Sequence, residues 1–228
     1  MTQRESAKTE TLAEDLIRTI DELCLQKMKI HNKKRPTLYT TLQMYRNDKL
    51  DELKKLIEQA KKHHFILGIK LVRGAYIKKE NEYSKNKKIK SVLNKNKQET
   101  DTAYDKALNF CFENSDCIAL FAGTHNEKSM KLFHELYKKN PPKHNHFMTS
   151  QLKGMCDHIT FNLAQKGIPA SKYIPYGPAE ETIPYLIRRA EENSSILGET
   201  ARELKILETV IACGLKTSSI PNGSKIDL

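Results

Sequence analysis

Four side chains with the chemistry of a carboxylate clamp occur near the C-terminal end of the sequence. They are Tyr185, Arg188, Arg189 and Glu192. Because they are separated by three or four residues, they would share one face of a helix. A guanidinium group can bind a carboxylate through two parallel hydrogen bonds and keeps its charge. A carboxylate clamp is therefore a candidate here, although the spacing alone favours the alternative, an exposed arginine pair bridged to Glu191 and Glu192.

A strand and a turn are predicted directly before this helix. Residues 173–176 (Tyr-Ile-Pro-Tyr) have the apolar and aromatic character of a short strand, which Gly177 and Pro178 would end. The helix is expected to run over residues 182–193, with acidic residues at its positive end and Pro184 in its first turn. The clamp would therefore follow the end of a strand.

Strand and helix patterns alternate along the rest of the chain. Strands are predicted from about residues 37, 66, 117, 146 and 173, and helices over 10–30, 48–64, 98–114, 127–138, 154–165 and 198–212. Repeated βα units indicate an α/β protein with a parallel sheet, either doubly wound or barrel-forming. No glycine-rich GxGxxG follows a strand, so a Rossmann domain is poorly supported.

Polar residues gather just after the predicted strand ends, which is where a (β/α)8 barrel has its active site. They are Gln43, Arg73, Thr124, His125, Asn126, Gln151 and Tyr173. Four apolar strand residues are candidates for either layer of the sheet. These are Leu71, Ile118, Leu120 and Phe147.

Length and composition favour one domain over residues 1–228, with a frayed tail at 216–228. The net charge is +11, and much of it lies in the run from Lys78 to Lys97. A solvated loop is favoured there over a nucleic-acid or lipid patch, since aromatic and glycine residues do not interleave. The five cysteines lack zinc spacing, so no metal is expected, and their odd number indicates reduced thiols in an intracellular compartment.

Four motifs occur in one order between residues 70 and 193, within a resemblance that runs over about residues 13–207. They are KLVRGAY at 70–76, THNE at 124–127, QLKGMCDH at 151–158, and KYIPYGP with YLIRRAEEN within 172–193. Together they resemble the flavin-dependent proline dehydrogenase family. The resemblance implies FAD, oxidation of L-proline to 1-pyrroline-5-carboxylate in proline catabolism, and electron transfer from the flavin to a quinone or another acceptor. It also implies a distorted (β/α)8 TIM-like barrel, of which this chain would supply about the last five strands.

The same resemblance assigns roles to individual residues. Arg188 and Arg189 would bind the substrate carboxylate, and Glu192 would hold one guanidinium in place. Tyr173, Tyr185 and Leu152 would pack against the proline ring.

The resemblance also assigns Gln43 and Lys70 to flavin binding, with Lys70 near the flavin N5. Lys70, Tyr173 and Tyr185 are the candidate catalytic residues. Tyr76 would buttress the flavin ring. Thr124, His125 and Asn126 would contact the phosphates and the distal part of the dinucleotide. Arg73 is expected to form an ion pair with Glu80.

One departure from the family concerns the acidic motif before the first helix, of which only Ala13 and Glu14 remain. The alternative function is therefore a truncated or degenerate fragment without activity. We expect the 228-residue chain alone to bind flavin weakly, and a relative's N-terminal segment fused upstream of Leu12 to restore turnover. The expected location is the cytoplasm, or the mitochondrial matrix in a eukaryote, with peripheral association with the inner membrane left open.

Overall fold

A computed structural model describes residues 21–74, 77–88, 91–144 and 146–194. The chain divides into two compact units, one of residues 1–151 and 157–172, the other of residues 152–156 and 173–228. The predicted helix over 198–212, the tail over 216–228 and the pair Ala13 and Glu14 lie outside the described residues.

The described chain alternates strands and helices, as the sequence patterns predict. The strands are β1 (Thr40–Gln43), β2 (Leu67–Val72), β3 (Ile118–Gly123), β4 (Phe147–Leu152) and β5 (Ala170–Tyr173). The helices are α2 (Lys49–His63), α3 (Ile77–Lys87), α4 (Lys97–Glu113), α5 (Glu127–Lys139), α6 (Asp157–Gln165) and α7 (Ala179–Ser194). Residues 21–31 are also helical, in line with the predicted first helix.

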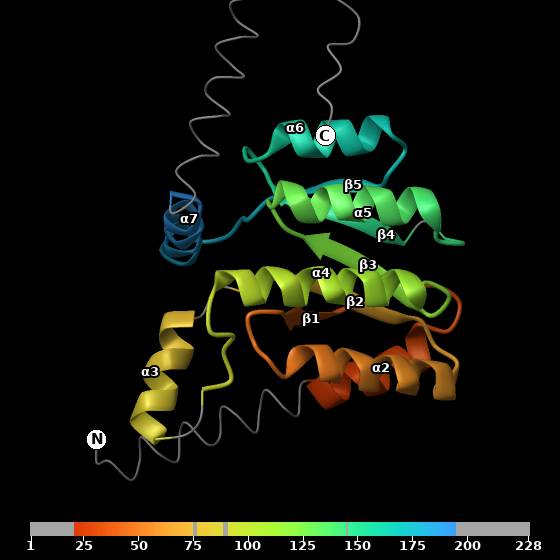
Figure 1. Cartoon of the computed structure of the whole chain (residues 1–228), viewed down its shortest axis with the longest axis horizontal. Helices are drawn as coiled ribbons and strands as arrows, with labels where there is room; N and C mark the ends of the chain where they lie inside the picture. Colours follow the sequence, from red (N-terminus) through yellow and green to blue (C-terminus); the bar gives the residue numbers. More distant parts are fainter. Residues whose placement is uncertain (1–20, 75–76, 89–90, 145, 195–228) are drawn as a thin grey trace, which may run out of the picture. The chain divides into compact units, whose positions relative to one another are not determined.

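The strands form one sheet in the order β1-β2-β3-β4-β5, and the pairs from β1 to β4 are parallel. Helices α2, α4, α5 and α6 lie side by side over one face of this sheet (Figure 1). Crossovers of one hand place successive helices on one face when each strand is added beside the last. A doubly wound sheet reverses its strand order at a switch point, and the described strands contain no such reversal.

The core lies between the sheet and these helices. Phe112 of α4 contacts the rings of Phe133 of α5 and Phe147 of β4 at centroid distances of 5.1 and 4.9 Å. Four apolar strand residues could not be assigned to one layer from the sequence. All four are fully buried, and strand alternation places them on the helix-covered face of the sheet. They are Leu71, Ile118, Leu120 and Phe147.

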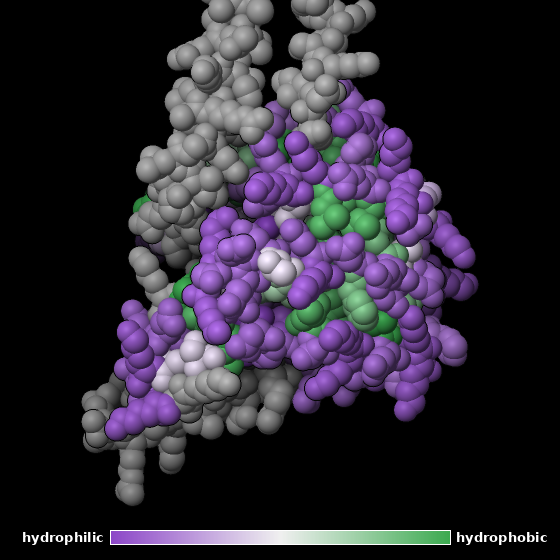
Figure 2. Space-filling view, viewed as in Figure 1, coloured by the Kyte–Doolittle hydropathy of each residue, from purple (hydrophilic) through white to green (hydrophobic). Residues whose placement is uncertain are grey.

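The opposite face of the sheet carries Lys70, Phe121 and Met148, which lie opposite one another in register and are only half-buried. Tyr39 covers part of this face, with its ring 5.0 Å from that of Phe121 in an edge-to-face contact. The outer surface of the helices is largely hydrophilic (Figure 2). A charged fraction of 29% is thus accounted for by solvated helix faces.

Asn32 fixes the entry into the sheet. Its Oδ1 accepts hydrogen bonds from the backbone N–H groups of Thr37 and Leu38, at 2.9 and 3.0 Å. Its Nδ2 donates to the carbonyls of Leu38 and Ile66, at 2.9 and 3.0 Å. Because the side chain is fully buried, each of these bonds satisfies a group that water cannot reach.

The Lys-rich segment predicted as a loop contains helix α3, which is a correction. Glu80 lies in the first turn and Lys85 and Lys87 in the last, an arrangement that suits the helix dipole. The Glu80 carboxylate also accepts hydrogen bonds from Tyr45 and Arg46, both at 3.1 Å. The sequence was interpreted from the number of lysines in this segment and not from the separation of acidic and basic residues between its two ends.

Two boundaries near the clamp also differ from prediction. Strand β5 ends at Tyr173, where the sequence predicted a strand to begin, because Pro175 has no N–H to continue a ladder. Helix α7 starts at Ala179, so Pro184 lies inside the helix instead of in its first turn. The carbonyl of Pro178 accepts from Thr182 N at 3.0 Å, and this bond starts the helix early. Among the described residues, no helix is long and apolar enough to cross a membrane.

Candidate active site

Gln43 and Lys70 lie on the face of the sheet opposite the helices. Lys70 is paired with Thr41 in the parallel register, and Gln43 is two residues further along β1, so the two side chains share a face. Both are half-buried near the carboxyl ends of their strands. A methyl group on Gly123 would lie 3.2 Å from Val72 Cγ1 and 3.7 Å from Lys70 Cε, so this glycine lies beside the lysine side chain on the same face.

The turn between β3 and α5 holds the three residues expected to contact the dinucleotide. The Asn126 side chain caps α5 by accepting from Ser129 N at 3.0 Å. The Thr124 hydroxyl accepts from Asn126 N at 3.1 Å. His125 is half-buried between them. The first turn of a helix has backbone N–H groups without intrahelical acceptors, which favours anions there.

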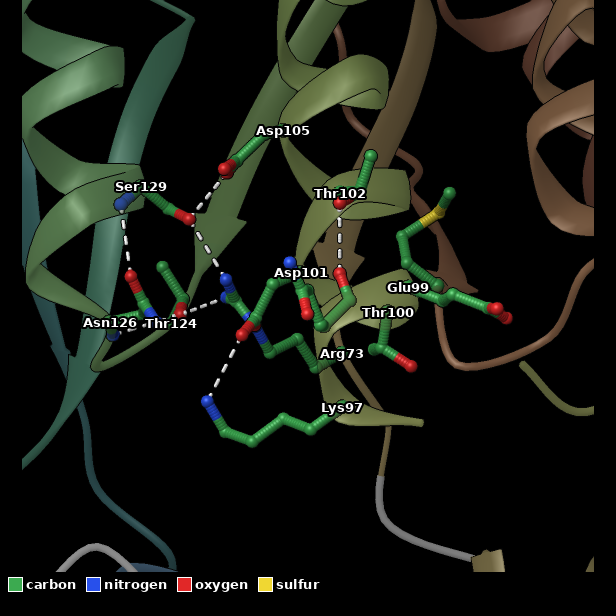
Figure 3. A network of polar contacts seen from close by, with 12 residues as sticks. Arg73, Lys97, Glu99, Thr100, Asp101, Thr102, Asp105, Thr124, Asn126 and Ser129 are labelled. Carbon is green, nitrogen blue, oxygen red and sulfur yellow. Dashed lines mark hydrogen bonds and ion pairs between the residues drawn. The ribbon is translucent and has the colours of Figure 1, made fainter. Parts of the chain in front are cut away.

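Arg73 is the centre of a polar network behind this turn (Figure 3). Its Nε donates to Asp101 of α4 at 2.5 Å, its Nη1 to Thr124 at 2.6 Å, and its Nη2 to Ser129 of α5 at 2.8 Å. The expected ion pair between Arg73 and Glu80 is therefore wrong. Arg73 shares the strand side of Leu71 and points to the helix layer, whereas Glu80 lies against the loop after β1.

Arg73 and Lys97 both donate hydrogen bonds to the Asp101 carboxylate, at 2.5 and 3.0 Å. Burial alone would raise the pKa of Asp101, but hydrogen bonds from Arg73 and Lys97 outweigh it, so the pKa lies below its usual value. The Tyr104 ring lies 4.3 Å from the Arg73 guanidinium carbon, which is a cation–π contact. Burial raises the pKa of the Tyr104 phenol, so this hydroxyl stays protonated.

Gln151 of β4 forms hydrogen bonds to the turn between β3 and α5 and to helix α6. Its Nε2 donates to the Thr124 carbonyl at 3.2 Å, and its Oε1 accepts from Thr160 at 2.9 Å. His158 Nε2 lies 3.1 Å from Glu127 in the first turn of α5. The polar residues of the THNE and QLKGMCDH motifs thus contact one another.

The second compact unit contains the residues predicted to hold the substrate. The rings of Tyr173 and Tyr185 lie edge to face with centroids 6.0 Å apart, and the Arg189 guanidinium carbon lies 5.6 Å from the Tyr185 ring centroid. Lys153 N donates to the Tyr173 carbonyl at 3.0 Å, so the segment of Leu152 runs beside Tyr173. The structure brings together an aromatic pair and a cation, which suits an apolar ring that carries a carboxylate.

Three predicted site side chains lie outside what the structure describes. Arg188 and Glu192 are placed by their backbone in α7, while Tyr76 is not described at all. Within the described ranges, no group of three or more His, Cys, Asp or Glu side chains could hold a metal ion.

The partners of Arg73 were not predicted from the sequence. Asp101 and Asp105 are four residues apart in a helix, so they present two carboxylates on one face. Ser129 lies in the first turn of α5 and donates to Asp105 at 2.5 Å. The spacing of the two aspartates indicates an acidic helix face. It identifies Arg73 as the partner of that face only when the position of Arg73 is known.

The described strands and helices define a parallel α/β domain, and its strand-end residues Gln43 and Thr124 are candidates for a ligand site at the carboxyl edge of the sheet. The model of the family described as "Proline dehydrogenase" matches residues 6–202 of this chain. The chain belongs to that family.

Individual relatives agree with this membership. Proline dehydrogenase 1, mitochondrial, from Drosophila melanogaster is 35% identical over 200 residues, which cover 82% of this chain and 29% of the relative. The carbapenem antibiotics biosynthesis protein CarD from Pectobacterium carotovorum is 35% identical over 189 residues, or 83% of this chain and 48% of the relative. The chain thus spans between about a third and a half of the length of these relatives.

A solved structure shares the fold. Proline utilization A (PutA) from Bdellovibrio bacteriovorus, inactivated by N-propargylglycine, matches with a TM-score of 0.69 and 24% identity. The match covers 75% of this chain and 18% of that one. The arrangement of five parallel strands is therefore that of a larger known protein.

Proposed function

We propose that this chain takes part in the FAD-dependent oxidation of L-proline to 1-pyrroline-5-carboxylate. The observation that carries the proposal is the family match over residues 6–202, which contains both the Gln43 and Lys70 face and the Tyr173, Tyr185 and Arg189 cluster. The relatives' names include proline dehydrogenases, and the aromatic and cationic cluster has the chemistry that a ring with a carboxylate requires.

The residues present fit a flavin dinucleotide. A half-buried cation lies on the face of the sheet opposite the helices, where it would stabilise charge on a reduced ring, and a capped turn that carries the Thr124 hydroxyl lies at the start of α5. When bound, FAD would accept the hydride that leaves the ring carbon next to nitrogen. Gln43 and Lys70 would hold the flavin ring, with Tyr76 as a buttress, and Thr124, His125 and Asn126 would hold the phosphates and the distal part.

The protein's task in the reaction is to bind and orient the substrate. Arg188 and Arg189 would fix its carboxylate, with Glu192 supporting one guanidinium, and Leu152, Tyr173 and Tyr185 would enclose its ring. As the hydride leaves the ring carbon, the ring nitrogen would release a proton to solvent, so that a carbon–nitrogen double bond would form. A quinone or another acceptor would take up the two electrons that the hydride carried.

We also propose that the sheet is part of a (β/α)8 barrel. Sequential strand order and helices on one face support this arrangement, since both are features of barrels. The half-buried face of Lys70, Phe121 and Met148 would then be the barrel interior. We place the activity in the cytoplasm, or in the matrix of mitochondria, with peripheral membrane association as the route to a quinone.

A fragment without activity is the second candidate. The observation that favours it is that the chain spans only 29% of the Drosophila relative and 48% of the Pectobacterium one. A flavin whose surroundings are incomplete would be exposed to water, and the activity would be low.

The test is a titration of the purified chain with FAD, followed by proline-dependent reduction of a dye acceptor. Saturable binding with a shifted visible spectrum and proline-dependent dye reduction are expected of the enzyme. Binding without reduction would favour the fragment, and a fusion with a relative's N-terminal segment should then restore turnover. Failure of both the chain and the fusion to bind FAD would refute the flavin function.

A further inference from the structure

The Arg73 side chain links three elements that surround the turn between β3 and α5. It reaches Asp101 in the N-terminal part of α4, Thr124 in the turn itself and Ser129 in the first turn of α5. The guanidinium group is planar and its donors have fixed directions, so three simultaneous bonds define the relative positions of their acceptors. Figure 3 shows this arrangement from close by.

These bonds determine how the Thr124 hydroxyl can act. A hydroxyl group has two lone pairs and one proton. Thr124 Oγ1 accepts from Arg73 Nη1 at 2.6 Å and from Asn126 N at 3.1 Å, so both lone pairs are used. The hydroxyl can then act toward a ligand only as a donor. A donor requires an acceptor, and a phosphate oxygen is the strongest one in a dinucleotide.

Arg73 itself is unsuited to bind the anion. Asp101 neutralises it directly, and Asp105 does so through Ser129, whose hydroxyl accepts from Arg73 and donates to the carboxylate. The Tyr104 ring lies against the guanidinium as well. A cation that is already paired in this way adds little attraction for a distant charge.

We propose that Arg73 is a positioning residue for cofactor binding, which holds the turn and commits the Thr124 hydroxyl to donate to the diphosphate of the dinucleotide. This inference rests on the proposed flavin function and adds to it the residue that sets the polarity of the phosphate site. Arg73 acts through Thr124 and has no contact of its own with the cofactor.

A double-mutant cycle on FAD affinity tests the coupling. Arg73→Lys should weaken FAD binding about tenfold, because an ammonium group cannot reproduce three directed bonds. Thr124→Val should weaken it to a similar extent, whereas Thr124→Ser, which keeps the hydroxyl, should not. In the Thr124→Val background, Arg73→Lys should change the affinity less than twofold. An equal tenfold loss in both backgrounds would overturn the proposal.

Hydrogen exchange provides a second measurement that needs no cofactor. Arg73→Lys should speed exchange of the Asn126 amide, which is bonded to Thr124, about tenfold. Lys61→Met is the matched control, because Lys61 contacts Asn114 at the opposite end of α4 at 2.6 Å. Its loss should leave Asn126 exchange unchanged. If the unmutated protein fails to bind FAD, the proposed flavin function is refuted. The exchange rates still test whether Arg73 positions the turn. An unchanged exchange rate of the Asn126 amide in Arg73→Lys would refute that positioning role.

Discussion

The ring of Tyr45 occupies the space beside the α-carbon of Gly74, where any larger side chain would have to lie. The two residues belong to loops that follow neighbouring parallel strands, β1 and β2. Tyr45 N also donates to the Arg73 carbonyl at 2.8 Å, so backbone and ring both join the loops. Tyr45, in the loop after β1, therefore leaves room only for glycine at position 74 of the KLVRGAY motif.

Gly74→Ala should lower the free energy of unfolding by about 3 kcal/mol or more, as measured by urea denaturation. A methyl group would overlap the Tyr45 ring, and the φ of +111° disfavours any side chain. Gly154→Ala is the matched control, since Gly154 has a φ of +80° but open space around its α-carbon. Its cost should be about 1–2 kcal/mol. Equal losses of unfolding free energy in the two variants would show that the Tyr45 ring moves aside to accommodate the methyl group.

Tyr104→Phe should raise the free energy of unfolding by about 1 kcal/mol in the same assay. The Tyr104 hydroxyl is fully buried and has no hydrogen-bond partner, so its removal relieves a desolvation cost. Phenylalanine keeps the ring that lies 4.3 Å from the Arg73 guanidinium carbon. Tyr104→Leu removes that ring as well and should be less stable than Tyr104→Phe. A loss of stability in Tyr104→Phe would mean that the hydroxyl is satisfied.

The alternation of strands and helices was predictable from sequence because each βα unit carries its own periodic pattern. The buried run from Leu67 to Val72 is an example: it is apolar on both faces except at Lys70. Strand ends were harder, because β5 is defined by pairing with β4 and not by the aromatic residues that follow it. Thr149 N donates to the Pro169 carbonyl at 3.0 Å, a contact that local propensity does not report.

The site was predictable only in part, and for a similar reason. The shared face of Gln43 and Lys70 follows from strand alternation and agrees with the described register, whereas their roles toward a flavin rest on the motif resemblance and stay a prediction. The partner of Arg73 was not predictable, because Asp101 and Glu80 are both acidic residues in helices that follow β2. Only the direction of the strand, which points Arg73 to the helix layer, distinguishes them.

Acid should destabilise the protein below about pH 4. A hydrogen bond from Arg46 lowers the pKa of Asp48, and bonds from Arg73 and Lys97 outweigh burial to lower that of Asp101. A carboxyl group with a depressed folded-state pKa stabilises the fold above its unfolded pKa, and that contribution is lost as the pH falls through the folded value. The effect of Asp48 is expected to be below about 1 kcal/mol, because its side chain is 45% exposed.

Unfolding in urea at several pH values measures this effect. Asp48→Asn should reduce the loss of stability on acidification, and salt at about 0.5 M should reduce it further by screening. Stability that stays constant or rises between about pH 5 and pH 3 would contradict the assignment of these two carboxylates.

Lys70→Met should lower the reduction potential of bound FAD and alter it more than it alters the affinity for proline. The ammonium group would stabilise negative charge on the reduced ring, so its loss disfavours the reduced form. Lys54→Met, which removes an exposed lysine paired with Asp51 on α2, is the control and should leave the potential unchanged. An unshifted potential together with a collapse of proline binding would show that Lys70 serves the substrate instead.

Arg188→Lys and Arg189→Lys should each weaken proline binding by about 1.5–3 kcal/mol, which a competition assay with a proline analogue can measure in any form that binds FAD. A lysine keeps the charge but cannot form the planar pair of bonds to a carboxylate. Arg189→Lys should also weaken the contact with Tyr185, whose ring centroid lies 5.6 Å from the guanidinium carbon, since a guanidinium group stacks on an aromatic ring better than an ammonium group. Arg35→Lys, at an exposed arginine before β1, controls for a general effect of the substitution and should leave the affinity unchanged. Proline affinity that is the same in both clamp variants as in the unmodified protein would exclude the arginine pair as the carboxylate site.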